Sequence, residues 1–170
     1  ELAGRRIAIT GSTGFLGTAL VERLLRCAPD CELVLVVRPG RRGAGRRVER
    51  DILRNDAFER LRADLGADEF AEMADRRLTA VAGDVTVDGL GLDEEGRVAL
   101  ASCDLVIHSA ASVSFDSPLD QAVEVNLLGP VRIVQTLTEL GVTPHLVAVS
   151  TCYVAGSRRG AAPEEAVDAS

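Results

Sequence analysis

Neither lysine nor tryptophan occurs anywhere in the 170-residue sequence, and aromatic residues make up only 3% of it. A core without many large rings has to be built from Val, Leu, Ile and Ala, in a chain that is 46% hydrophobic. Such a core is typical of parallel α/β sheets. The length is that of one domain, and we expect residues 1–170 to form a single unit.

Because lysine is absent, all 19 basic residues are arginines, and 26 acidic residues outweigh them to a net charge of -7. An acidic chain is a poor candidate for general nucleic-acid binding. The arginines nevertheless gather between Arg38 and Arg50. This segment has the charge to hold a phosphate locally, despite the overall sign.

The four cysteines show neither a C-x-x-C spacing nor neighbouring histidines, so the sequence indicates no zinc or other metal site and no disulfide framework. No apolar run approaches the roughly 20 residues of a membrane span, and no signal peptide opens the chain. We therefore expect a reduced, cytoplasmic protein without a transmembrane segment. The sequence does not indicate an oligomeric state.

Short apolar runs alternate with helical stretches along most of the chain. Strands are expected at 6–10, 33–37, 78–85, 104–111 and 145–151, and helices at 15–27, 93–102 and 119–140. Pro130 lies inside the last helix and predicts a kink there. Residues 40–77 interrupt the alternation, and we interpret them as an Arg-rich insert with one or two amphipathic surface helices.

The alternation of nearly all-apolar strands with helices predicts a Rossmann-like, doubly wound parallel sheet of about five strands. The expected strand order is 3-2-1-4-5, incomplete at its C-terminal side. Such sheets bind ligands at the carboxyl ends of their strands. Candidate site residues should therefore directly follow strands.

The stretch TGSTGFLG, residues 10–17, lies between the first strand and the first helix. Gly11 permits a tight turn, Gly14 lets the backbone approach a pyrophosphate, and Gly17 allows close packing of helix and strand. The phosphates would bind the free N–H groups at the helix N-terminus. The motif predicts dinucleotide binding, with a plain tight turn as the alternative.

The residue that ends the second strand distinguishes NAD from NADP, because an acidic group there binds the ribose 2'-OH and an arginine accommodates a 2'-phosphate. Here that residue is Arg38, and Arg47 follows in the arginine-rich segment. Guanidinium groups match phosphate geometry, so we expect NADPH as cofactor. The alternative is that several of these arginines only solvate a loop.

Two further strands end in residues that suit a nucleotide. Asp84 and Val85 follow the third strand and can accept from the adenine amino group and pack on its ring, or Asp84 can simply cap a turn. Ser109, Ala110 and Ala111 follow the fourth strand and leave room for ribose and nicotinamide, although small residues there can also mean close packing.

Ser150 and Thr151 end the fifth strand, where nicotinamide and substrate should meet. A hydroxyl there can stabilise the negative charge that develops on a substrate carbonyl as hydride arrives, but both residues are also ordinary strand-end caps. His108 and His145 lie beside strands without a carboxylate or cysteine at ligand spacing, so we interpret both as structural.

Together these motifs resemble the extended short-chain dehydrogenase/reductase superfamily. TGSTGFLG, LVVRPG, AGDV, HSAASVSFDSPL, VNLLGP and AVSTCYV are most similar to fatty acyl-CoA reductases and to the thioester-reductase domains of carboxylic acid reductases. The resemblance covers residues 6–156. The glycine motif alone would also fit sugar-nucleotide epimerases and dehydratases.

The resemblance implies NADPH-dependent reduction of a fatty acyl-CoA or carrier-bound thioester to an aldehyde, and onward to an alcohol in some members. Carried over to this chain, it implies that Arg38 and Arg47 bind the 2'-phosphate and that Thr151, with Ser150 as its substitute, supplies the catalytic hydroxyl. The cofactor residues it implies are Gly11, Ser12, Thr13, Gly14, Phe15, Leu16, Gly17, Asp84, Val85, Ser109, Ala110, Ala111 and Asn126.

The family's catalytic Tyr precedes its Lys by four residues, and here Tyr153 is followed by Ser157 in a chain without lysine. General acid assistance is typically worth about 10² to 10⁴ in rate, so this chain alone should be nearly inactive. Two interpretations stay open. Either these residues are the cofactor half of a longer reductase whose Tyr-x-x-x-Lys helix and substrate lobe lie elsewhere, or they form a noncatalytic NADP-binding module.

Overall fold

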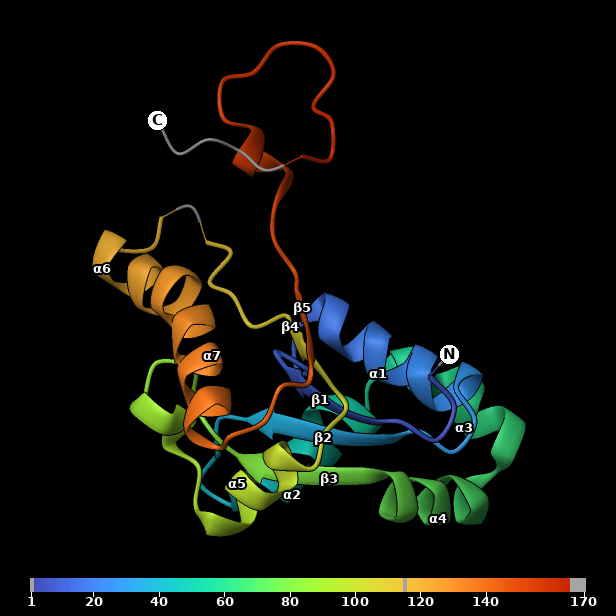
Figure 1. Cartoon of the computed structure of the whole chain (residues 1–170). Helices are drawn as coiled ribbons and strands as arrows, with labels where there is room; N and C mark the ends of the chain where they lie inside the picture. Colours follow the sequence, from blue (N-terminus) through green and yellow to red (C-terminus); the bar gives the residue numbers. More distant parts are fainter. Residues whose placement is uncertain (1, 115, 166–170) are drawn as a thin grey trace.

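Five parallel strands form one sheet in the computed structural model, which describes residues 2–114 and 116–165 (Figure 1). The strand order is β3-β2-β1-β4-β5, so the predicted Rossmann-like sheet and its order are confirmed. The strands are β1 (Arg6–Thr10), β2 (Glu32–Val37), β3 (Leu78–Ala82), β4 (Leu105–His108) and β5 (His145–Ala148).

Three strands end earlier than the sequence predicts, at Ala82, His108 and Ala148. After β3 the chain turns back at once, since the amide of Asp84 donates to the carbonyl of Leu90 at 2.8 Å. The small and apolar residues that prolonged the predicted strands therefore belong to loops. These loops line the carboxyl edge of the sheet.

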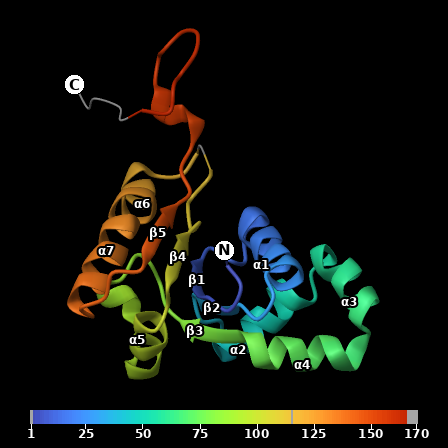
Figure 2. The same cartoon turned by 45° about the vertical axis from the view of Figure 1, so that its right-hand side comes forward.

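Side chains that alternate along the strands divide the core into two layers. Ile7 and Ile9 face one layer and Ala8 faces the other. Helix α1 (Phe15–Cys27) covers the first face, while α5 (Glu94–Ala101) and α7 (Gly129–Glu139) cover the second (Figure 2). The doubly wound arrangement follows from this division.

Residues 43–77 form more elements than predicted. They comprise α2 (Gly43–Val48), the π-helical η1 (Glu49–Leu53), the 3-10 turn η2 (Asp56–Phe58), α3 (Glu59–Leu65) and α4 (Ala67–Arg77). The expected number of one or two helices was too low. The amphipathic pattern is confirmed, because Ile52 and Phe58 are completely buried in the core with Ile7 and Ile9. The π and 3-10 turns break the 3.6-residue period on which the prediction relied.

Arg77, the last residue of α4, lies buried beneath the C-terminal end of α1. Its guanidinium donates to the carbonyl oxygens of Leu25 at 2.7 Å, Ala28 at 2.6 Å and Cys31 at 2.8 Å. A cation at this place satisfies carbonyls that have no partner within the helix. The side chain thus joins the segment 43–77 to the first βαβ unit.

The long helix expected at 119–140 is divided into α6 (Leu119–Ala122), the π-helical η4 (Val123–Leu128) and α7. Pro130 occupies the first turn of α7, where its missing N–H costs nothing. The structure therefore accommodates Pro130 by a change of helix type before it. Within the described part of the chain, no helix has the length and apolar character to cross a membrane.

Candidate nucleotide-binding site

The turn after β1 has room only for glycine at two positions. Gly11 has φ of +73°, and a Cβ there would lie 2.5 Å from the amide nitrogen of Ala110. A Cβ at Gly17 would overlap the carbonyl oxygen of Gly11. The backbone of this turn thus presses against the end of β4 on one side and against α1 on the other.

The N-terminus of α1 faces outward from this turn without a side-chain cap. Gly14 is the N-cap residue, and its amide donates to the Gly11 carbonyl at 3.0 Å. Phe15 is 98% exposed and Leu16 is 45% exposed, while the Ser12 hydroxyl is buried with no partner among the described residues. Uncapped amides, a glycine cradle and an orphan hydroxyl fit a bound diphosphate.

A buried hydrogen-bond chain supports the turn from below. The Thr10 hydroxyl lies 2.7 Å from Nδ1 of His108 and accepts a hydrogen bond from the Ala110 amide at 3.4 Å. Burial lowers the pKa of His108 below 6.5, so the imidazole is neutral at pH 7. The structural interpretation of His108 agrees with this contact. The role of Thr10 was not predicted, although Thr10 and His108 both end neighbouring strands.

Asp84 and Val85 form part of a compact loop after β3. The Asp84 carboxylate accepts hydrogen bonds through Oδ1 from the amide and hydroxyl of Thr86, at 2.9 and 2.8 Å. Among the described residues Oδ2 has no hydrogen-bond partner. Asp84 thus caps a turn, which is one of its two interpretations. Val85 is buried beside Gly129.

Arg38 and Arg47 lie together at the end of β2 but differ in their contacts. Arg47 donates to the carbonyl of Arg38 at 2.7 Å, and its Nε lies 3.4 Å from Asp51. Arg38 is exposed, and no described residue forms a hydrogen bond or ion pair with its guanidinium. Arg38 is therefore the arginine of this pair whose charge is available to a ligand.

The loop after β4 is held by Asn126 of η4. The Asn126 side chain accepts from the amide of Ser112 at 2.8 Å and donates to its carbonyl at 2.9 Å. These two hydrogen bonds fix the chain directly after Ser109, Ala110 and Ala111. Ala110 also lies against the Gly11 turn. Asn126, which the resemblance implies among the cofactor residues, thus holds this loop from η4.

Ser150 and Thr151 are exposed beyond the end of β5. The Thr151 hydroxyl accepts from the Tyr153 amide at 3.2 Å and caps the short turn η5 (Cys152–Ala155). Figures 1 and 2 show this segment rising from the sheet. The described contacts do not bring Thr151 against the glycine turn, although both lie beyond the carboxyl edge.

Hollows of about 400 and 370 Å³ lie elsewhere on the molecule. Both border the C-terminal end of α1, the first near Leu2 and Cys27 and the second near Leu61 and Met73. The glycine turn lies at the opposite end of the same helix. Neither hollow contains a residue that the sequence singled out.

Residues 9–170 match the family model of the male sterility protein, an NAD-binding domain family. The match spans nearly the whole chain, including the glycine turn and the loops after all five strands. The chain belongs to this family. The resemblance to the extended short-chain dehydrogenase/reductases of the fatty acyl-CoA reductase type is thereby confirmed.

Curated proteins similar to this chain are fatty acyl-CoA reductases. Fatty acyl-CoA reductase 8 of Arabidopsis thaliana is 32% identical over 96% of this chain and 34% of its own length. Human fatty acyl-CoA reductase 2 is 29% identical over 88% of this chain and 28% of its own length. The chain thus spans about a third of the length of these relatives.

Solved reductase domains share the fold of this family member. The terminal R domain of the myxalamid PKS-NRPS biosynthetic pathway is 30% identical, with a TM-score of 0.68 over 94% of this chain and 38% of that one. The PhqB reductase domain of Penicillium fellutanum is 27% identical, with a TM-score of 0.62 over 87% of this chain and 37% of that one.

Proposed function

We propose that this chain is the NADPH-binding part of a reductase that converts a fatty acyl-CoA or carrier-bound acyl thioester to an aldehyde. The observation that carries the proposal is the turn Gly11–Gly17, which has no room for a Cβ at Gly11 or Gly17 and leads into the uncapped N-terminus of α1. It lies in a chain whose relatives include fatty acyl-CoA reductases and the R domain of a PKS-NRPS pathway.

NADPH supplies hydride, which would reduce the thioester carbonyl carbon. The Thr151 hydroxyl, with Ser150 as its substitute, would donate a hydrogen bond to the carbonyl oxygen while negative charge develops on it. A proton then has to reach that oxygen, and cleavage of the C–S bond releases the thiol and leaves the aldehyde. A Tyr and a Lys from outside this chain would provide the proton, because the chain contains no lysine.

Specificity for NADPH is assigned to Arg38, whose guanidinium is free to pair with the ribose 2'-phosphate. Arg47 holds the Arg38 carbonyl and so orients the end of β2. Asp84, through Oδ2, would accept from the adenine amino group while Val85 packs beside its ring. Ser109, Ala110 and Ala111 would line the ribose and nicotinamide.

Adding one methyl group at Gly14 tests whether the glycine turn binds the diphosphate. Gly14 has φ of -83°, which any residue adopts, and a Cβ there would lie 3.3 Å from the Gly11 carbonyl oxygen, a close contact that a small shift relieves. Gly14→Ala should therefore fold but weaken NADPH binding about tenfold or more, measured by nucleotide fluorescence titration. Gly45→Ala, in open space on α2, is the matched control and should bind as before.

The reaction itself is tested on the full-length protein with NADPH and palmitoyl-CoA. We expect oxidation of NADPH, followed as loss of absorbance at the nicotinamide band, with release of free thiol in equal amount. If the protein instead turns over a nucleotide sugar and reduces no thioester, it belongs to the epimerase and dehydratase class. Tight NADPH binding without any turnover would identify a noncatalytic module.

A further inference from the structure

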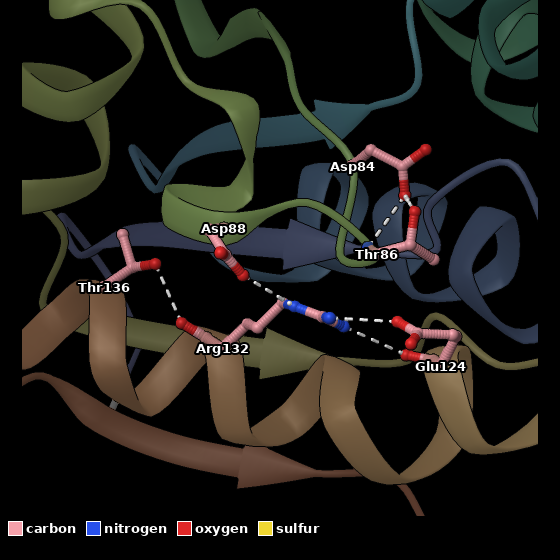
Figure 3. Close-up of polar contacts among 6 residues, drawn as sticks. All are labelled: Asp84, Thr86, Asp88, Glu124, Arg132 and Thr136. Atoms are coloured by element: carbon pink, nitrogen blue, oxygen red, sulfur yellow. Dashed lines mark hydrogen bonds and ion pairs between the residues drawn. The ribbon is translucent and has the colours of Figure 1, made fainter.

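Arg132 of α7 connects two segments that are far apart in the sequence. Only 16% of its side chain is exposed, and the guanidinium lies between Asp88 and Glu124 (Figure 3). Nε donates to Asp88 at 3.2 Å, a terminal nitrogen lies 2.9 Å from the Glu124 carboxylate, and the other donates to the Glu124 carbonyl at 3.4 Å. Asp88 belongs to the 3-10 turn η3 (Asp88–Gly91) and Glu124 to η4.

The loop that contains Asp88 is closed by its own backbone. The amide of Asp84 donates to Leu90, that of Val87 to Asp84, and that of Leu90 to Val87, at 2.8, 3.1 and 2.9 Å. Leu90 is buried, and Thr86 fixes the Asp84 carboxylate. Because these hydrogen bonds make the loop a single unit, a contact that fixes Asp88 also fixes the orientation of the Asp84 carboxylate, four residues earlier.

The other partner of Arg132, Glu124, lies in the same π-helix as the residue that holds the loop after β4. Glu124 precedes Asn126 by two residues in η4, and Asn126 clasps both backbone groups of Ser112. Ser112 directly follows Ala110 and Ala111. The backbone of Arg132 is itself fixed, since its carbonyl accepts from the hydroxyl of the buried Thr136 at 2.8 Å.

We propose that Arg132 is a positioning residue that sets the spacing between the two ends of the nucleotide site. It holds the Asp84 loop, which would receive adenine, against the segment that carries Asn126 and, through it, the loop that would receive nicotinamide. The assignment of the two ends rests on the proposed function. Asp88 is 98% exposed, and a solvated ion pair is worth little. Arg132 itself is largely buried, however, and among the described residues its hydrogen bonds and ion pairs are the only polar side-chain contacts that join the Asp84 loop to η4. Apolar packing of Val85 and Leu90 with Val125 accompanies this polar link.

The test compares binding of NADPH with binding of its analogue in which hypoxanthine replaces adenine, using the full chain. The analogue has no amino group to donate to Asp84, so the unaltered chain should bind it about tenfold more weakly. Arg132→Met should weaken NADPH about fivefold and reduce the preference for adenine toward unity, because Asp84 is no longer held in place. Arg60→Met, which breaks an exposed pair with Asp64, should change neither.

Two further variants separate positioning from general stability. Arg132→Lys keeps one ion pair and should restore part of the adenine preference. Asp88→Asn combined with Glu124→Gln removes both carboxylates at exposed positions, leaves Arg132 in place, and should reproduce the loss seen in Arg132→Met. A folded double variant that keeps the full adenine preference would overturn the proposal.

Amide hydrogen exchange measures the link without any nucleotide. In the same double variant the Ser112 amide, which donates to Asn126, should exchange at least several-fold faster than in the unaltered chain. An unchanged rate at Ser112 would overturn the proposal even if NADPH binds. Failure of the unaltered chain to bind either nucleotide, with faster exchange at Ser112 in the variant, would instead refute the proposed function and leave the link between the loops standing.

Discussion

Arg38 carries the charge that would distinguish the two nicotinamide cofactors. Arg38→Asp should weaken NADPH binding by about tenfold or more, because a charge-assisted hydrogen bond is replaced by repulsion of the 2'-phosphate. NADH binding should change far less. Titration of both nucleotides checks this expectation, with Arg23→Asp, an exposed arginine nearer the other end of α1, as the control. Equal losses for NADPH and NADH would remove the assignment to the 2'-phosphate.

His108 makes the stability of the protein depend on pH. Its pKa is lowered by burial in the folded state, so between that value and 6.5 the unfolded chain binds more protons. Above pH 6.5, His108 should therefore not reduce the free energy of unfolding. As the pH falls from 6.5 toward the folded-state pKa of His108, the free energy of unfolding should decrease. Urea unfolding at pH 7.5 and 5.5 measures this difference. It should shrink in His108→Asn and persist in His145→Asn, which alters an exposed histidine.

Burial also separates the cysteines. Cys31 and Cys103 are buried and Cys27 and Cys152 are exposed, and burial raises the pKa of Cys103 to about 11. Two of the four thiols are therefore packed inside the protein. The sequence neighbours could not separate them, because the buried Cys31 and Cys103 each adjoin an aspartate, and only the fold covers these two thiols.

At the scale of elements, the end of α1 depends on one side chain from a distant helix. Arg77→Met should lower the free energy of unfolding by roughly 2–4 kcal/mol, because several buried carbonyl oxygens lose a charged donor together. The neighbouring exposed residue provides the control, and Arg76→Met should have an effect within about 0.5 kcal/mol. Denaturant unfolding measures both. A small effect for Arg77→Met would mean that water or a rearranged backbone satisfies these carbonyls.

The regular elements were predictable because their patterns are local. Residues 15–27 repeat apolar side chains at helical spacing, and the observed α1 has the same bounds. The segment 43–77 was not predictable in the same way. Phe58 is buried through a 3-10 turn, and Arg77 is buried because it meets carbonyls at and just beyond the end of α1, some 46 to 53 residues away. A charged residue at a helix end carries no local sign of such a partner.

For the whole molecule, the free edge of β5 has consequences for association. β5 is the last strand of the described sheet, and Val147 and Val149 are 40% and 41% exposed. An uncovered strand edge is a template for pairing, so this 170-residue chain should self-associate as its concentration rises. Val147→Lys should suppress this in sedimentation velocity, whereas Val98→Lys, at an exposed position on α5, should not. A monomer at every concentration would contradict the expectation.

The candidate site was predictable where a motif and a strand end coincide, as at Gly11 and Asp84. It was not predictable where residues meet only through the fold. Thr10 and His108 are 98 residues apart, and Asp88 and Arg132 are 44 apart. Each pair is joined by the parallel crossovers rather than by spacing along the chain. One sequence without its fold gives no reason to connect them.

The position of β1 between β2 and β4 also determines when the cradle can form during synthesis. Gly11 lies against Ser109 and Ala110, so the glycine turn leaves the ribosome before the residues that support it, which are made about 100 residues later. At roughly 5–20 residues per second that delay is about 5–20 s. Through that interval the nascent chain has no formed nucleotide cradle, and cofactor can stabilise it only after β4 has emerged.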